Sequence, residues 1–118
     1  MGETVALLHI AFEDRGLKLI ETKSRAVKKY EIHELMITDE DATPGGGANR
    51  VRAIGFFEIT ESGLIVVGDE VYIEDRLLGS LVGYDQTHMP NHLNIVVKSK
   101  TLDEPALRVG DKIRFKST

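Results

Sequence analysis

The chain has 118 residues, with 15 Lys and Arg against 19 Asp and Glu, 42% apolar residues and no Cys. This length allows one domain, residues 1–118, and the composition is that of a globular protein rather than a disordered one. The absence of cysteine excludes disulfides, thiol nucleophiles and thiolate metal sites. A net charge of −4 argues against a nucleic-acid-binding protein, which needs an excess of Lys and Arg.

The longest apolar stretch near the start covers residues 5–12, and a membrane-spanning helix needs about 20 residues. No basic segment precedes it and no cleavage site of small residues follows, so it does not resemble a signal peptide. We therefore expect a cytoplasmic protein without a membrane partner.

Short strands are predicted along most of the chain. Apolar and β-branched runs alternate with turns rich in Gly, Asp and Glu, which is typical of small barrels and sandwiches. The strands are expected at residues 4–12, 17–22, 32–37, 52–60, 64–67, 71–73, 77–84, 93–98 and 113–115. The first two are expected to pair as a hairpin across the charged turn Glu13–Gly16.

Two segments between the strands read differently. Ser24–Tyr30 is ambiguous, because its cations and its apolar residues also have the spacing of one or two helical turns. Asp39–Asn49 contains Pro44 and three consecutive glycines. We expect it to be a mobile loop, because glycine loses the most conformational entropy on ordering and nothing apolar there would anchor it.

Val67–Ile73 resembles Val109–Phe115, since each is a Gly-Asp turn followed by an alternating strand. Convergence and an internal repeat would both explain this similarity, and both favour a fold with many short strands. Gly79 and Gly83 lie within a predicted strand, where glycine often marks a bulge or a sharp bend at a barrel corner.

The predicted fold class is therefore all-β: a small single-domain β-barrel, or barrel-like sandwich, with at most one short helix. The core is expected to consist of the inward-facing apolar residues of these strands. They are Val5, Leu7, Ile54, Phe56, Ile65, Val71, Ile73, Leu81, Val82, Leu93, Ile95, Val97, Ile113 and Phe115.

From Leu35 onward, the order of motifs resembles the enzyme IIA component of the glucitol/sorbitol-specific phosphotransferase system. The resemblance depends on order and spacing over roughly the last two-thirds of the chain. The matching residues are Leu35-Met36-Ile37-Thr38, Gly68-Asp69, Leu81-Val82-Gly83, His92, Pro105 and Val109-Gly110-Asp111-Lys112-Ile113. The resemblance implies a small all-β domain that carries a phosphoryl group on a histidine.

That histidine is absent here. In the family it lies in the strand between the Pro/Gly loop and the Gly-Asp turn, where this chain has Ala53–Glu58. Phe56 or a neighbour takes its place, and a phenyl ring cannot accept phosphate. Residues 98–104 also lack the family's longer, glycine-containing insertion. The resemblance therefore implies the fold without the phosphotransfer chemistry at that position.

The loop between the strands ending at residue 84 and starting at residue 93 is the main candidate site. It contains Asp85, His88, Asn91 and His92. His88 and His92 have the i, i+4 spacing of helical zinc ligands, but Pro90 lies between them and no helix is expected. The histidines could cap strand ends, line a polar ligand pocket or, with Asp85, hold a metal. We predict neither a metal nor a cofactor.

A second candidate segment contains the glycines 45–47 with Arg50 and Arg52. Glycine amides and guanidinium groups both suit an anion, although the Lys-Ser/Thr pair of a phosphate-binding loop is missing. A flexible connector is the alternative. We expect the most polar concave site to combine this segment with the 85–92 loop, since barrels leave recognition to the loops at their strand ends.

No catalytic constellation is visible, which favours a non-enzymatic role. The main hypothesis is a non-catalytic β-barrel module that binds a small molecule or a protein partner. The alternative is a phosphoryl carrier, small enzyme or metal site that uses His88 and His92. Exposed strand edges in so small a barrel make a homodimer plausible.

Overall fold

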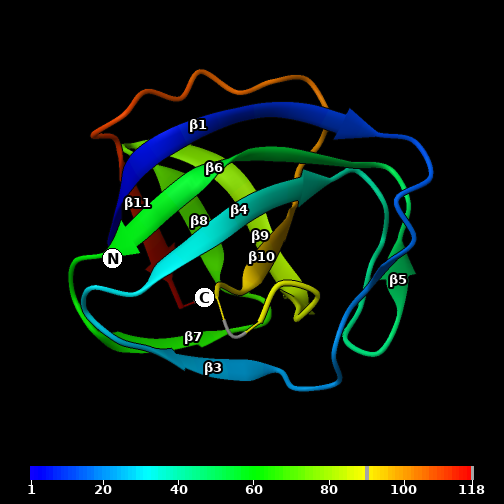
Figure 1. Ribbon diagram of the computed structural model, residues 1–118, viewed down its shortest axis with the longest axis horizontal. Coiled ribbons are helices and arrows are strands. Elements are labelled where there is room, and N and C mark those ends of the chain that lie inside the picture. The colour runs from blue at the N-terminus through cyan, green and yellow to red at the C-terminus, as the bar shows by residue number, and fades with distance from the viewer. Residues whose placement is uncertain (90, 118) are drawn as a thin grey trace.

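The predicted all-β class is confirmed by the computed structural model, which describes residues 1–89 and 91–117 (Figure 1). Those residues contain no helix, and each predicted strand is present in whole or in part. The strands are β1 (Gly2–Phe12), β2 (Leu17–Lys18), β3 (Ser24–Val27), β4 (Ile32–Thr38), β5 (Gly47–Ala48), β6 (Val51–Ile59), β7 (Gly63–Val66), β8 (Glu70–Ile73), β9 (Arg76–Asp85), β10 (Asn94–Lys98) and β11 (Lys112–Lys116).

Seven strands close into a barrel in the order β1-β11-β8-β9-β10-β4-β6. All neighbours are antiparallel except β10 and β4, which are parallel. The predicted hairpin between residues 4–12 and 17–22 is wrong. Barrel closure places β6 and β11 on the two edges of β1, so β2 pairs with β5 instead.

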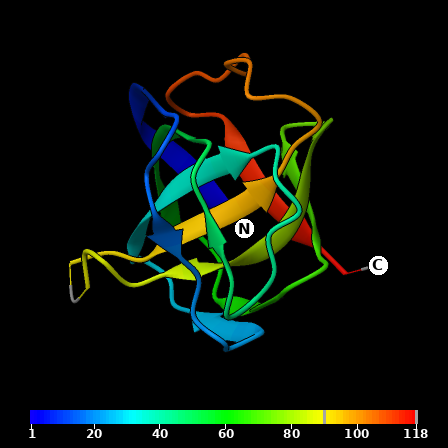
Figure 2. The same ribbon diagram turned by 90° about the vertical axis from the view of Figure 1, so that its right-hand side faces the viewer.

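A separate antiparallel ribbon is formed by β3 and β7. It crosses one end of the barrel, and residues 99–111 cross the opposite end (Figures 1 and 2). The helical alternative for Ser24–Tyr30 is therefore wrong. Val27 is buried against the inner apolar core of the barrel. The segment ends in a turn, where Tyr30 takes a φ of 82°.

The ribbon is tied to the barrel through Tyr84 of β9, which is fully buried. Its hydroxyl donates to the carbonyl of Ile65 in β7 at 3.1 Å. Burial raises the pKa of Tyr84 to about 12, and the charge of Asp69 adds to the shift.

Two apolar clusters fill the molecule, because successive residues of a strand point to opposite faces. The inner cluster fills the barrel. The outer cluster lies where β2, β5 and the residues around them cover β4, β6 and β10. It consists of Leu17, Leu19, Met36, Ala42, Ala48, Val51, Ala53 and Val96.

Most of the predicted core is confirmed, although Phe56, Val82 and Phe115 are only half-buried. The assignment of Val5 and Leu7 to the core is wrong, because both side chains are exposed. The pairing of β1 with β6 shifts between Thr4 and Ala6 and again after Leu7. Burial still alternates along this part of β1, with Gly2, Thr4, Ala6 and Leu8 as the more covered residues, so Val5 and Leu7 take the exposed positions.

The bulges expected near the two strand glycines are confirmed. The β9 register shifts against β8 beside Gly79 and against β10 beside Gly83. At Gly79 the β10 backbone comes so close that an added Cβ would lie 1.8 Å from the carbonyl oxygen of Lys98.

The expectation that nothing apolar anchors Asp39–Asn49 is wrong. Ala42 and Ala48 are buried in the outer cluster. The Glu40 carboxylate accepts the backbone N–H groups of Asn49 and Arg50 at 2.8 and 2.5 Å. The mobility of this segment stays a prediction.

We expect Gly79→Ala to lower the free energy of unfolding by about 2–3 kcal/mol, because the new methyl group would overlap backbone that cannot move independently. Gly63→Ala in β7 is the matched control, since nothing lies within 4 Å of the position that its new methyl group would take. It should change stability by less than about 0.5 kcal/mol in urea unfolding. Equal effects of the two substitutions would contradict the close approach.

Candidate functional site

A row of polar side chains crosses three neighbouring strands on the outside of the barrel. Asn94 in β10 is in register with Glu34 in β4 on one side and with Asp85 in β9 on the other. All three residues are buried. A buried charge or amide is costly unless it is hydrogen-bonded, so these residues restrict how the surrounding chain can fold.

Asp85 holds the base of the 85–92 loop. Its two carboxylate oxygens accept hydrogen bonds at 2.8 Å from the Thr87 hydroxyl and from the Asn94 side-chain amide. The other amide atom, Asn94 Oδ1, is buried without a partner in the described part of the chain. Asp85 therefore serves as an anchor for the loop.

The loop then makes a single turn that brings the two histidines together. The backbone N–H groups of Asn91 and His92 donate to the carbonyl of His88 at 3.0 and 3.3 Å. The two imidazole rings lie 5.0 Å apart between centroids and are tilted by 30°. The i, i+4 spacing thus juxtaposes the rings without a helix. Pro90, predicted within this loop, lies outside the described residues.

His92 contacts two residues of the barrel wall. Its Nε2 atom lies 3.2 Å from Oε1 of Glu34, and both side chains are mostly buried. Its ring is nearly perpendicular to that of Phe56 of β6, at a centroid distance of 5.0 Å. An imidazole between a carboxylate and an aromatic ring is held in one orientation.

His33, the neighbour of Glu34, faces the other side of β4 and is buried. Its Nδ1 accepts the backbone N–H of Leu93 at 3.1 Å, and its Nε2 lies 3.1 Å from the Glu31 carboxylate. These contacts suit a neutral ring that donates from Nε2. Burial lowers the pKa of His33, while the hydrogen bond to Glu31 acts in the opposite direction.

An apolar groove lies beside this cluster, with a volume of about 210 Å³. We call it the β4–β6 groove. It is lined by side chains of β1, β4 and β6, the turn after β1, and the histidine loop. These are Leu8, Ile10, Phe12, Arg15, Glu34, Met36, Ala53, Phe56 and His88.

The two predicted arginines have other partners. Arg50 contacts the carboxylates of Glu13 and Asp39 at 3.5 and 3.2 Å, and Arg52 donates from Nε to the carbonyl of Leu102 at 2.7 Å. Arg52 is in register with Ile37, three residues along β4 from Glu34. The arginines therefore lie towards the other end of β4, away from the imidazoles.

A second cavity, of about 470 Å³, does join the two predicted segments. Asp85, Gln86 and Thr87 face Gly45 across it, with residues 18–21 completing the wall. Asn91, the remaining predicted residue, is exposed on the loop. The structure therefore brings the side chains of His88 and His92 into contact with each other.

Glu34 and His33 were missed by the predictions from sequence. The available signal was a carboxylate next to a histidine within an otherwise apolar strand, where burial demands a partner. The partner, His92, is 58 residues away and was not identifiable from spacing.

Among residues 1–89 and 91–117, no group of three or more His, Asp or Glu side chains is arranged to hold a metal ion. That part of the chain also has no helix with the length and apolar character needed to cross a membrane.

A family model described as "Family of unknown function (DUF6917)" matches residues 1–116, so the chain belongs to this family. No curated protein and no solved structure matches the chain. The resemblance to the phosphotransferase component stays untested by these comparisons.

The burial of His33 predicts that stability falls on acidification. Because its pKa is lower in the folded state, the stabilisation is complete above the ordinary histidine pKa of about 6.5 and is lost as the pH falls below it. In thermal unfolding between about pH 8 and pH 5, His33→Gln should show a shallower loss than the unchanged chain. Ile32→Gln, at the exposed and non-titrating position next to His33, is the control and should keep the full slope. An unchanged slope in His33→Gln would contradict this assignment.

Proposed function

We propose that this chain is a non-catalytic β-barrel module that binds a small molecule in the β4–β6 groove. The observation that carries the proposal is the position of Glu34. A carboxylate whose side chain is only 11% exposed lies beside an apolar groove, with one oxygen bonded to His92. In the described chain its second oxygen, Oε2, makes no hydrogen bond.

The groove favours a ligand with an apolar body and one hydrogen-bond donor, such as a small amine or alcohol. Six of its lining residues are apolar or aromatic, and such surfaces contribute most of the burial in small-molecule sites. The donor would bond to the free oxygen of Glu34. Arg15, whose guanidinium carbon lies 5.6 Å from the centre of the Phe12 ring, would contact a polar group at the other end.

The site is also preorganised, which reduces the entropy lost on binding. Asp85 fixes the start of the histidine loop, and Glu34 and Phe56 fix His92. A ligand would meet side chains that are already oriented.

Screening a fragment library by ligand-observed NMR should recover apolar amines and alcohols. Glu34→Gln should weaken their binding at least tenfold, since a hydrogen bond to a charged group contributes about 1.5–3 kcal/mol. Glu104→Gln is the control, because this carboxylate is exposed and contacts His9 instead. Fragments that bind equally well to both variants, or no saturable fragment, would contradict the proposal.

A phosphoryl carrier that uses His92 is the second candidate function. Phe56, which with its neighbours corresponds to the place of the family's missing histidine in that resemblance, contacts the ring of His92 directly. The Glu34 carboxylate accepts a hydrogen bond from Nε2 of His92, so the ring proton stays on Nε2 and the lone pair of Nδ1 is the nucleophile. In the transfer, the N–P bond of a donor phosphohistidine breaks as a new N–P bond forms at Nδ1 of His92, and the Nε2 proton stays against Glu34.

Incubation with phosphoenolpyruvate, enzyme I and the phosphocarrier protein tests this candidate by intact mass. The carrier function predicts an acid-labile gain of one phosphoryl group that His92→Ala abolishes and His88→Ala retains. The non-catalytic module predicts no gain in mass. A gain that survives His92→Ala would exclude His92 as the acceptor.

A homodimer and a cytoplasmic location remain part of the proposal. Analytical ultracentrifugation and fractionation of the native cells would test each directly.

A further inference from the structure

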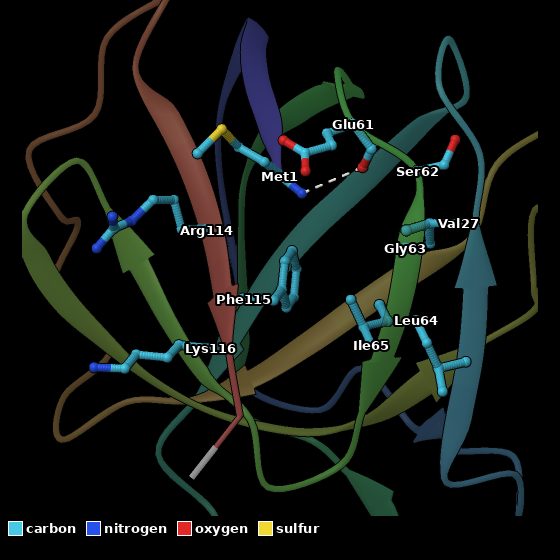
Figure 3. A pocket seen from close by; sticks show the side chains of 10 residues that line it. All are labelled: Met1, Val27, Glu61, Ser62, Gly63, Leu64, Ile65, Arg114, Phe115 and Lys116. Atoms are coloured by element: carbon cyan, nitrogen blue, oxygen red, sulfur yellow. Dashed lines mark hydrogen bonds between the residues drawn. The ribbon is translucent and has the colours of Figure 1, made fainter.

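A cavity of about 450 Å³ separates the β3–β7 ribbon from the barrel (Figure 3). Gly63, Leu64 and Ile65 of β7 line one side, and Arg114, Phe115 and Lys116 of β11 line the other. We call it the β7–β11 slot. It is distinct from the β4–β6 groove and shares no lining residue with it.

The β11 side of the slot is a free strand edge. The backbone N–H of Glu74 donates to the carbonyl of Lys112, so these two residues form a hydrogen-bonded pair between β8 and β11. Such pairs alternate along an antiparallel ladder, so the backbone groups of Arg114 also point towards β8. Phe115, the next residue along β11, is paired with Val71 and points its N–H and carbonyl the other way. On that side β1 pairs with β11 only at Lys112 and Ile113, so within residues 1–89 and 91–117 no strand pairs with Phe115 there.

The β7 side is a second free edge. The backbone N–H of Val67 donates to the carbonyl of Lys23, which sets the phase of the ribbon. Arg25 and Ile65 therefore bond to each other, whereas Leu64 points its N–H and carbonyl away from β3 and towards β11. Figure 3 shows β7 between β3 and the slot.

The two faces of the slot differ in chemistry. Phe115, Ile65 and Val27 form its inner, apolar side. Arg114 and Lys116 extend from the outer face of β11, and Leu64, 63% exposed, lies on the outer face of β7. At one end, Glu61 lies beside Met1, whose amino group donates to the Glu61 carbonyl at 3.5 Å.

We propose that the β7–β11 slot accepts an extended segment of a partner protein as an added strand, with apolar residues facing inward and acidic residues facing outward. Backbone groups of Phe115 and Leu64 would bond to its two edges, the mode known as β-augmentation. Outward Glu or Asp would lie across from Arg114 and Lys116, where opposite charges on one face attract.

Charge complementarity identifies the partner as acidic, although the chain itself has a net charge of −4. A second copy of this chain is a poor occupant. Its acidic and alternating stretch, Glu70–Glu74, includes β8, which is already paired on both edges within the barrel.

The test uses a defined probe, the peptide acetyl-Glu-Val-Glu-Val-Glu-amide, titrated to about 1 mM into ¹⁵N-labelled protein. We expect saturable NMR shifts centred on the amides of Leu64 and Phe115. N-methylation of alternate peptide residues should abolish them, because it removes the backbone donors on one edge. The corresponding Lys-Val peptide should bind at least tenfold more weakly.

Two proline variants give a matched pair. Leu64→Pro removes the N–H that faces the slot, whereas Ala26→Pro removes the N–H on the outer edge of β3, and neither breaks a bond within the ribbon. Leu64→Pro should abolish binding and Ala26→Pro should retain it. Arg114→Gln with Lys116→Gln should weaken binding about tenfold, and the control pair Lys18→Gln with Lys100→Gln should not.

The opposite result for the two prolines would place the peptide on β3 and overturn the proposal. No saturable shift, or equal binding of the N-methylated peptide, would also overturn it. If Leu64→Pro does not fold, the comparison of the methylated and unmethylated peptides on the unchanged chain still decides. Binding of the chain to anionic lipid vesicles that survives Leu64→Pro, without peptide binding, would show a purely electrostatic surface instead.

Discussion

The structure depends on the burial of β10 on both faces. Asn94, Ile95, Val96 and Val97 are all buried, with Ile95 and Val97 in the inner cluster and Val96 in the outer one. Strands covered on both sides are common where parallel pairing occurs, and β10 and β4 form the one parallel pair of this barrel. Polar side chains in this region therefore require partners within the protein, with the buried Asn94 Oδ1 as an unpaired exception among the described residues.

That requirement determines the positions of the loops. Asn94 bonds Asp85 and fixes the start of the histidine loop, and Glu34 contacts His92 and fixes its end. Thr38, at the other end of β4, donates to the carbonyl of Arg50 at 2.8 Å and holds the end of the glycine-rich segment. The β3–β7 ribbon lacks this constraint, and β7 keeps a free edge beside β11. The groove and the slot thus arise from two different conditions: enforced polar pairing in the first case, and a ribbon that forms its own sheet apart from the closed barrel in the second.

The positions of the strands could be predicted from the sequence, because alternation and turn residues are local signals. Which strands pair with each other could not be predicted from the sequence. The hairpin prediction for β1 was wrong because barrel closure depends on contacts between distant strands. Val5 was misplaced because alternation alone does not say which set of residues in β1 is covered. The i, i+4 spacing of His88 and His92 predicted neighbouring imidazoles only on a helix, which was not expected here, and the loop brings the rings together without one. The contact between Glu34 and His92 could not be predicted from the sequence, since only the fold brings the two residues together.

Both candidate functions depend on the contact of Glu34 with Nε2 of His92, which leaves Nδ1 without a hydrogen bond among the described residues. Long-range ¹H–¹⁵N correlation spectra of the imidazole rings, recorded at mildly alkaline pH, test it directly because they distinguish the two neutral tautomers. We expect His92 to be protonated on Nε2 in the unchanged chain and to become a mixture of tautomers in Glu34→Ala. A His92 ring protonated on Nδ1, or one that does not respond to Glu34→Ala, would contradict the account.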